Sequence, residues 1–168
     1  VFDAQHQRLG TVVEWKDMTE ELKRQAADLL LMNDNTRIRD ALNNIETCVM
    51  IADGKNDIIY MNKAVLSMLS AAESDLRKSL PNFSVNNLMN QNIDAFHKNP
   101  AHQRGLLDKL TTTYSSTIQV SNRTFSLIAN PVFNDKNERI GTVVEWKDRT
   151  AEVEVEQDIG RVVAAAVS

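Results

Sequence analysis

Alternation of apolar and polar residues predicts five β-strands after residue 47. Apolar residues spaced three or four apart predict short helices between the second and third strands, with breaks at Pro81 and Pro100. The expected strands are 48–52, 57–61, 114–121, 123–133 and 141–148, and the expected helical segments are 62–70, 71–83, 84–96 and 101–113. Two strands, several short helices and three further strands predict an α+β fold, with a five-stranded antiparallel sheet and helices on one face.

Side-chain parity assigns one face of the last strands to the interior. In 123–133, Phe125, Leu127 and Ala129 alternate with polar residues, although Ile128 falls on the polar side. In 141–148, Val144 and Trp146 share a face. By the same alternation the inward set is completed by Ile118 and Val120.

Two local signals mark the start of this region. Asp53 and Gly54 lie between the first two strands, where glycine gives a hairpin turn the backbone freedom it needs. Asn62 precedes an apolar helical pattern and is expected to cap that helix.

Residues 18–46 contain no glycine or proline and many helix formers, which predicts one long linker helix. An apolar stripe, interrupted at Asn35 and Thr36, indicates pairing with a second helix in a parallel dimer. The stripe is formed by Leu22, Ala26, Leu29, Leu31, Ile38, Leu42 and Ile45.

A repeat sets the domain organisation. Residues 1–21 match residues 132–152, and both copies contain the identical stretch GTVVEWKD. Each copy resembles the end of a β-hairpin followed by a helix. We therefore expect residues 1–17 to be the closing hairpin strands of a preceding, truncated domain of the same kind, and residues 47–150 to form a complete domain. Residues 151–168 would begin a C-terminal signalling helix or a HAMP relay domain.

Composition excludes several functions. The formal net charge of −4 provides no basic field for nucleic acid or an anionic membrane, and no stretch reaches the roughly 20 apolar residues of a membrane span. The single cysteine, Cys48, cannot form an internal disulfide and fits a reducing, cytoplasmic location. No Ser-His-Asp set, phosphate-binding loop or spaced carboxylate pair is present, so we expect no enzyme.

The order of strands and helices resembles a PAS domain, and WKDRT at 146–150 resembles the Asp-x-Thr ending of such domains. More specifically, NIDAFHKNPAHQR at 92–104 and RTFSLIANPVFNDKNERIGTVVEW at 123–146 resemble the haem-binding PAS domains of Aer-type soluble oxygen chemoreceptors, which are methyl-accepting chemotaxis proteins. This resemblance covers residues 47–150.

The resemblance implies a site for haem b, iron protoporphyrin IX. It implies that His97 ligates the iron, that the indole N–H of Trp146 faces the gas ligand, and that Leu127 lines the distal pocket. His102 occupies a second histidine position that contacts a haem propionate, although a surface role fits this residue equally well. Without the resemblance, His97 would be a surface or capping residue and Trp146 would be core filling.

The implied function is a sensor that binds O2, or alternatively CO or NO, at the haem iron and relays the signal through the last strand to the C-terminal helix. The full receptor would be a homodimer, and a HAMP relay domain can follow this chain. Its partners would be a chemotaxis histidine kinase and a coupling protein, which bind through domains outside this chain. The alternative is a cofactor-free PAS module for dimerisation and signal relay. A flavin-binding PAS is disfavoured, because no Asn-Cys-Arg motif occurs and Cys48 lies on a strand.

Overall fold

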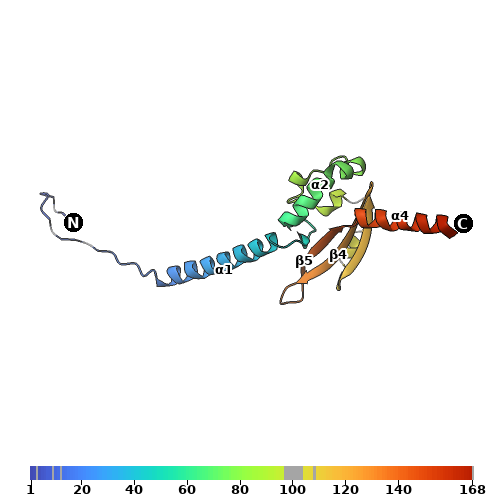
Figure 1. Cartoon of the computed structure of the whole chain (residues 1–168). Coiled ribbons are helices and arrows are strands. Elements are labelled where there is room, and N and C mark those ends of the chain that lie inside the picture. Colours follow the sequence, from blue (N-terminus) through green and yellow to red (C-terminus); the bar gives the residue numbers. More distant parts are fainter. Residues whose placement is uncertain (3, 9, 12, 97–103, 108, 168) are drawn as a thin grey trace. The chain divides into compact units, whose positions relative to one another are not determined.

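The computed structural model describes the chain except for residues 3, 9, 12, 97–103, 108 and 168 (Figure 1). The chain divides into two compact units, Val1–Asp40 and Ala41–Ser168. No helix of the described residues has the length and apolar character needed to cross a bilayer.

The long linker helix is confirmed as α1, Thr19–Asn43. Asp17 stabilises the first turn of this helix, because the Oδ1 atom of Asp17 accepts a hydrogen bond from the backbone N–H of Thr19 at 2.9 Å. The helix ends three residues before the expected boundary at 46, at the point where Asn62 binds the backbone carbonyl of Leu42 at 2.9 Å. No residue of α1 is buried, so its pairing with a second helix stays a prediction.

The first copy of the repeat forms little regular structure. Phe2 and Arg8 make an isolated antiparallel bridge, and none of the described residues between 1 and 17 lies in a strand. A strand needs a neighbour for its backbone N–H and C=O groups, and residues 13–17 have none here. Assignment of 1–17 to a preceding domain stays a prediction.

The second unit contains the predicted five-stranded antiparallel sheet. Its order is β2-β1-β5-β4-β3, which places the last strand at the centre. The strands are β1 (Cys48–Asp53), β2 (Ile58–Met61), β3 (Tyr114–Val120), β4 (Arg123–Phe133) and β5 (Arg139–Asp148). Figure 1 shows α2 beside one face of the sheet, as the sequence predicted.

The turn between β1 and β2 corrects one expectation. Gly54 does not adopt a positive φ, whereas Asn56 does, with φ of 69°. Asparagine tolerates the left-handed region better than other residues with side chains. Asp53 supports the turn, since its Oδ1 atom accepts from the N–H groups of Lys55 and Asp57 at 2.8 and 2.9 Å.

Helices cover the inner face of the sheet. The expected boundary at residue 70 is wrong, because α2 continues from Lys63 to Ser79 and stops only before Pro81. Two short 3₁₀ helices follow, η1 (Val85–Asn87) and η2 (Ile93–Phe96), and residues 104–107 are helical. The C-terminal helix α4 is Thr150–Val167.

Asn62 caps α2 as predicted, and the structure gives it further bonds. Its Oδ1 atom accepts from the N–H groups of Val65 and Val49, both at 3.0 Å. Its Nδ2 group donates to the carbonyls of Leu42 and Thr47 at 2.9 and 2.8 Å. The side chain is fully buried, so one residue joins the end of α1, the start of β1 and the start of α2.

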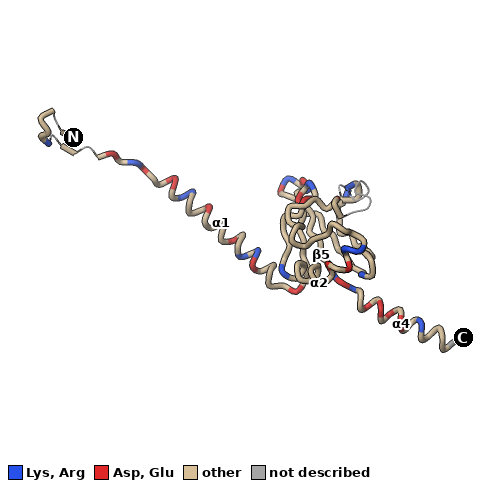
Figure 2. Tube along the Cα trace, turned by 90° about the horizontal axis from the view of Figure 1, so that it is seen from above, with Lys and Arg blue, Asp and Glu red and all other residues tan. Residues whose placement is uncertain are grey.

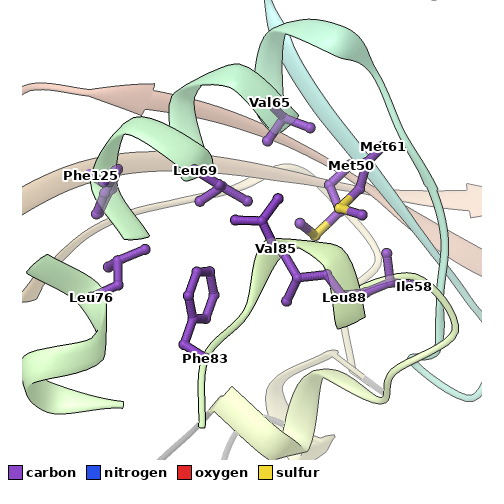
Figure 3. Close-up of a cluster of buried hydrophobic side chains, with 11 residues drawn as sticks. Met50, Ile58, Met61, Val65, Leu69, Leu76, Phe83, Val85, Leu88 and Phe125 are labelled. Atoms are coloured by element: carbon purple, nitrogen blue, oxygen red, sulfur yellow. The ribbon is translucent and has the colours of Figure 1, made fainter. Parts of the chain in front are cut away.

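The core lies between the sheet and the helices (Figure 3). Phe125 of β4 and Val65 of α2 are completely buried there. The other buried members are Met50, Ile58, Met61, Leu69, Ala72, Leu76, Phe83, Val85 and Leu88. Burial of this apolar surface is the main stabilising contribution to the fold.

Candidate functional site on the inner face of the last strand

Trp146 lies in the middle of the sheet. On β5 it stands directly opposite Cys48 of β1 on one side and Leu127 of β4 on the other. Residues directly opposite each other in an antiparallel ladder project to the same face. All three pack against the buried core, so the register places Trp146 and Leu127 on the inner face, as side-chain parity predicted.

Phe125 holds the indole ring of Trp146 from one side. The two rings meet edge to face, with centroids 6.0 Å apart and planes at 76°. Because Phe125 is fully buried, the indole has little freedom to tilt toward β4.

The Nε1–H group of Trp146 is buried and has no hydrogen-bond partner among the described residues. An indole N–H can only donate, so its missing partner must be an acceptor. A buried donor without a partner costs about 1 to 3 kcal/mol. The donor is therefore a position where an acceptor on a bound molecule would be favourable.

The inner face of the sheet that carries Trp146 is mainly apolar. Leu127, Ile118 and Val120 pack against the same core cluster, and Val144 stands opposite Ala129 and Met50. The predicted inward set of β3, β4 and β5 is thus found on one face. A flat apolar molecule with one acceptor near Nε1 of Trp146 fits such a wall.

A depression of about 510 Å³ opens beside Trp146. Cys48 and Met68 line it from the inner side, while Ser126, Ile128 and Glu145 belong to the other face of the sheet. The depression is therefore an opening around the end of β5, and not an enclosed porphyrin slot. A second cavity of about 320 Å³ lies between the C-terminal end of α2 and η2, where Phe96 and Phe83 form its apolar side.

Both histidines predicted for the site, His97 and His102, lie outside the described residues. The segment that leads to His97 is described: η2 ends at Phe96, whose ring meets that of Phe83 edge to face at 5.8 Å. Within the described ranges, no three His, Cys, Asp or Glu side chains come together as metal ligands. On the Trp146 side of the site, the buried indole N–H and the apolar inner face are compatible with haem.

Trp15 and His6, which belong to the first copy of the repeat, lie outside the core that surrounds Trp146. Trp15, the equivalent of Trp146 in the first repeat copy, is 89% exposed. His6 lies in the same copy with a positive φ of 63°. Neither residue belongs to the buried core cluster of the described residues.

Two features of the site were not predicted. Cys48 shares its rung with Trp146, and burial raises the pKa of its thiol. At the end of β5, Arg123 binds Asp75 and Asp148. Charged residues of both signs gather where β5 leads into α4 (Figure 2), and Arg149 there pairs with Glu152 at 2.9 Å. Sequence spacing gives no signal for the pairs of Arg123, whose partners are 48 and 25 residues away in the chain.

Comparison with known proteins finds a matching domain family and a similar receptor protein. A family model described as a PAS domain matches residues 36–99. The methyl-accepting chemotaxis protein McpB of Pseudomonas aeruginosa is 50% identical over 143 residues, which are 85% of this chain and 21% of McpB. The chain thus spans about a fifth of the length of that curated relative.

Solved structures of PAS domains also match this chain. The Aer2 receptor from Vibrio cholerae, a dual PAS-haem oxygen sensor, is 36% identical with a TM-score of 0.55, over 61% of this chain and 93% of that one. The PAS domain of BvgS from Bordetella pertussis matches with a TM-score of 0.51 at 10% identity, over 79% of this chain and 98% of that one. The second likeness concerns the fold alone.

Proposed function

Because this chain belongs to the PAS domain family, we propose that it is a haem-binding gas sensor of a chemotaxis receptor. Its resemblance to Aer-type receptors and its similarity to the Aer2 structure support haem b as the cofactor and O2 as the ligand. The module would act by binding and relay, and not as an enzyme.

The observation that carries the proposal is the unpaired donor of Trp146. A fold that buries an indole N–H without a partner loses stability, unless the working state supplies an acceptor. A generic core tryptophan can direct its N–H to a nearby carbonyl or to water. On β5, Trp146 instead stands opposite Leu127 with its ring against Phe125, and its buried N–H has no partner among the described residues.

Haem b, when bound, would supply the iron at which a diatomic gas binds. Of the residues in this chain, His97 would hold the iron through a ring nitrogen, and His102 would contact a propionate. Leu127 would keep water out of the gas side, and Trp146 would donate a hydrogen bond to a gas of partial negative charge. O2 accepts such a bond better than CO does, which favours O2 as the ligand.

The output would leave through β5. Asp148 ends this strand and caps α4, and Trp146 lies two residues before Asp148 and four before Thr150, where the C-terminal helix begins. We propose that this helix leads toward a HAMP relay, and that the full receptor is a cytoplasmic homodimer. Its partners would be a chemotaxis histidine kinase and a coupling protein, as the similarity to McpB suggests.

A visible absorption spectrum tests the proposal. The protein is purified from haem-supplemented cells, reduced, and then exposed to air, as the parent and as the His97→Ala variant. We expect a Soret band that shifts reversibly with oxygen in the parent and is lost or altered in His97→Ala. His6→Ala is the matched control, because this histidine lies outside the sheet unit, and it should keep the parent spectrum.

Circular dichroism of each variant shows whether the fold is retained, so that loss of haem can be separated from loss of structure. A folded parent that is colourless and does not take up added haem would overturn the proposal and leave the cofactor-free PAS relay. A yellow protein with a flavin spectrum would overturn it in favour of a flavin sensor.

A further inference from the structure

Arg123 stands between two carboxylates from different parts of the fold. Its Nε atom donates to Oδ2 of Asp75 on α2 at 2.8 Å, and its Nη1 atom donates to Oδ2 of Asp148 on β5 at 3.1 Å. The three side chains are 28%, 14% and 25% exposed in the order Arg123, Asp75, Asp148. The guanidinium group is suited to this position, because its donors point in fixed directions that one ammonium group cannot match.

Asp148 uses its other oxygen to begin α4. Oδ1 of Asp148 accepts from the backbone N–H of Thr150 at 2.9 Å and from its hydroxyl at 2.5 Å. The Thr150 hydroxyl oxygen in turn accepts from the N–H of Thr124 at 3.0 Å, and the carbonyl of Thr124 accepts from the N–H of Arg149 at 2.8 Å. The start of α4 is therefore bonded to the residue that follows Arg123.

The helix that carries Asp75 also carries the core side chains that face the sheet. Leu76, the next residue, is buried together with Leu69 and with Phe125 of β4 in one cluster (Figure 3). Phe125 therefore shares a packed cluster with the segment of α2 that holds Asp75, so a change in packing around Phe125 would act on that segment. Because Asp75 lies on α2, a movement of α2 would move the carboxylate that Arg123 binds.

We propose that Arg123 couples the position of α2 to the capping of α4, so that displacement of α2 through the core loosens the first turn of the C-terminal helix. The coupling chain is Asp75, Arg123, Asp148 and Thr150. It needs only these side chains, and it holds whether or not the domain takes haem. It gives the domain a second route from its interior to its exit helix, besides the movement of β5.

The ionisation of the group supports a fully charged network at neutral pH. Hydrogen bonds from Lys78 and Arg123 lower the pKa of the Asp75 carboxyl. Burial alone would raise the pKa of Asp148, but its bonds to Thr150 and Arg123 outweigh burial and leave that pKa lowered. The bond to Asp75 raises the pKa of Arg123.

Hydrogen exchange on the full chain tests the coupling, with peptides that cover the first turns of α4 as the readout. In Asp75→Asn the carboxylate on α2 is lost while Asp148 and Arg123 remain. Arg123 then has more rotamer freedom and holds Asp148 less well. We expect exchange at Thr150 and the three residues after it to become about two- to fivefold faster, the range expected when one partly exposed ion pair is lost.

Lys78→Gln is the matched control. Lys78 binds the same carboxylate at 2.7 Å but makes no ion pair with β5 among the described residues, so its removal should leave exchange in α4 at the parent rate. Equal exchange in Asp75→Asn and the parent would overturn the proposal, and so would equal acceleration by both variants.

A thermodynamic cycle gives an independent measurement. Asp75→Asn and Asp148→Asn are combined in the parent and again in an Arg123→Gln background, and unfolding is followed in urea. We expect the two substitutions to be non-additive in the parent and additive without Arg123. Additivity in both backgrounds would show that no coupling passes through Arg123.

Discussion

Phe125 of β4 and Asp148 of β5 stand directly opposite each other in the sheet, so the most deeply buried aromatic side chain shares a rung with the carboxylate that caps the exit helix. The neighbouring rung on the same face pairs Leu127 with Trp146. The proposed ligand site and the start of α4 are therefore adjacent along one face of β4 and β5. Sheet register alone brings a local change at Trp146 next to the exit helix.

Replacement of Trp146 should affect retention of oxygen. Trp146→Phe keeps an aromatic ring and removes the N–H group, and Trp146→Leu removes both. We expect both variants of the haem-loaded protein to release oxygen about tenfold faster or more, because a hydrogen bond of about 1.4 kcal/mol corresponds to a factor of ten. Stopped-flow measurement of oxygen release gives the rate.

Trp15→Leu is the control for this prediction, since the same octapeptide surrounds an exposed ring. It should keep the parent rate. An unchanged release rate in Trp146→Phe would contradict the role assigned to the indole N–H.

Gly141→Ala should destabilise the sheet. A Cβ atom at Gly141 would lie 2.5 Å from the carbonyl oxygen of Ala52 on β1, so the central pair of strands would have to separate. Forced shifts of this kind cost about 1 to 3 kcal/mol. Urea unfolding followed by circular dichroism measures the loss.

Gly10→Ala changes the same residue in the first repeat copy, where nothing lies within 4 Å of the added carbon. It should alter the free energy of unfolding by less than about 0.5 kcal/mol. Equal effects of the two substitutions would mean that the close approach of β5 to Ala52 is not present in solution.

Asn62→Ala should cost about 2 to 4 kcal/mol, because it leaves the buried N–H groups of Val49 and Val65 without their partner and also removes the part-buried bond to the carbonyl of Thr47. Chemical denaturation gives the value. Exposed Asn86 of η1 provides the control, and Asn86→Ala should change stability by less than about 0.5 kcal/mol. A loss of under 1 kcal/mol in Asn62→Ala would show that water replaces these bonds readily.

Acid should destabilise the domain through Asp75 and Asp148. Hydrogen bonds from Lys78 and Arg123 lower the pKa of Asp75 in the folded state, and for Asp148 the bonds from Thr150 and Arg123 outweigh burial and lower its pKa. The stability that these carboxylates contribute is thus fully present above about pH 4, near the unfolded pKa, and is lost as the pH falls through the folded pKa values. Urea midpoints between pH 2 and 7 should therefore fall at the acid end of this range.

Asp75→Asn should make that acid decline shallower. Asp17→Asn serves as the comparison: its pKa is also lowered, by the bonds from Thr19, but it belongs to the other unit. It should leave the acid decline of the sheet unit unchanged. A decline that is equally steep in the parent and in Asp75→Asn would contradict the assignment.

The order of elements could be predicted because apolar alternation repeats along each strand of the sheet. Parity also placed Phe125, Leu127 and Trp146 on the inner face. The left-handed turn residue was assigned wrongly, since both Gly54 and Asn56 suit such a turn and the sequence does not distinguish them. The end of α2 was set too early, because no residue between 70 and 79 stops a helix.

The ion pairs of Arg123 with Asp75 and Asp148 could not be predicted from the sequence. Arg123 is 48 residues from Asp75 and 25 from Asp148, and the chain has 19 basic and 23 acidic residues from which such pairs could be chosen. Only the approach of α2 to the end of the sheet selects these three. The unpaired state of the Trp146 donor likewise follows from its surroundings and not from its identity.

The repeated octapeptide GTVVEWKD separates what the sequence determined from what the tertiary structure decided. In both copies the final aspartate accepts a bond from the N–H of the threonine two residues later, at 2.9 Å for Asp17 and for Asp148, and a helix follows. This bond is local, so the sequence alone is sufficient for it. The strand is different: Trp146 lies in β5 between β1 and β4, whereas Trp15 is in no strand and is exposed. A strand takes its hydrogen bonds from residues distant in the chain, and only the folded domain brings those residues beside it.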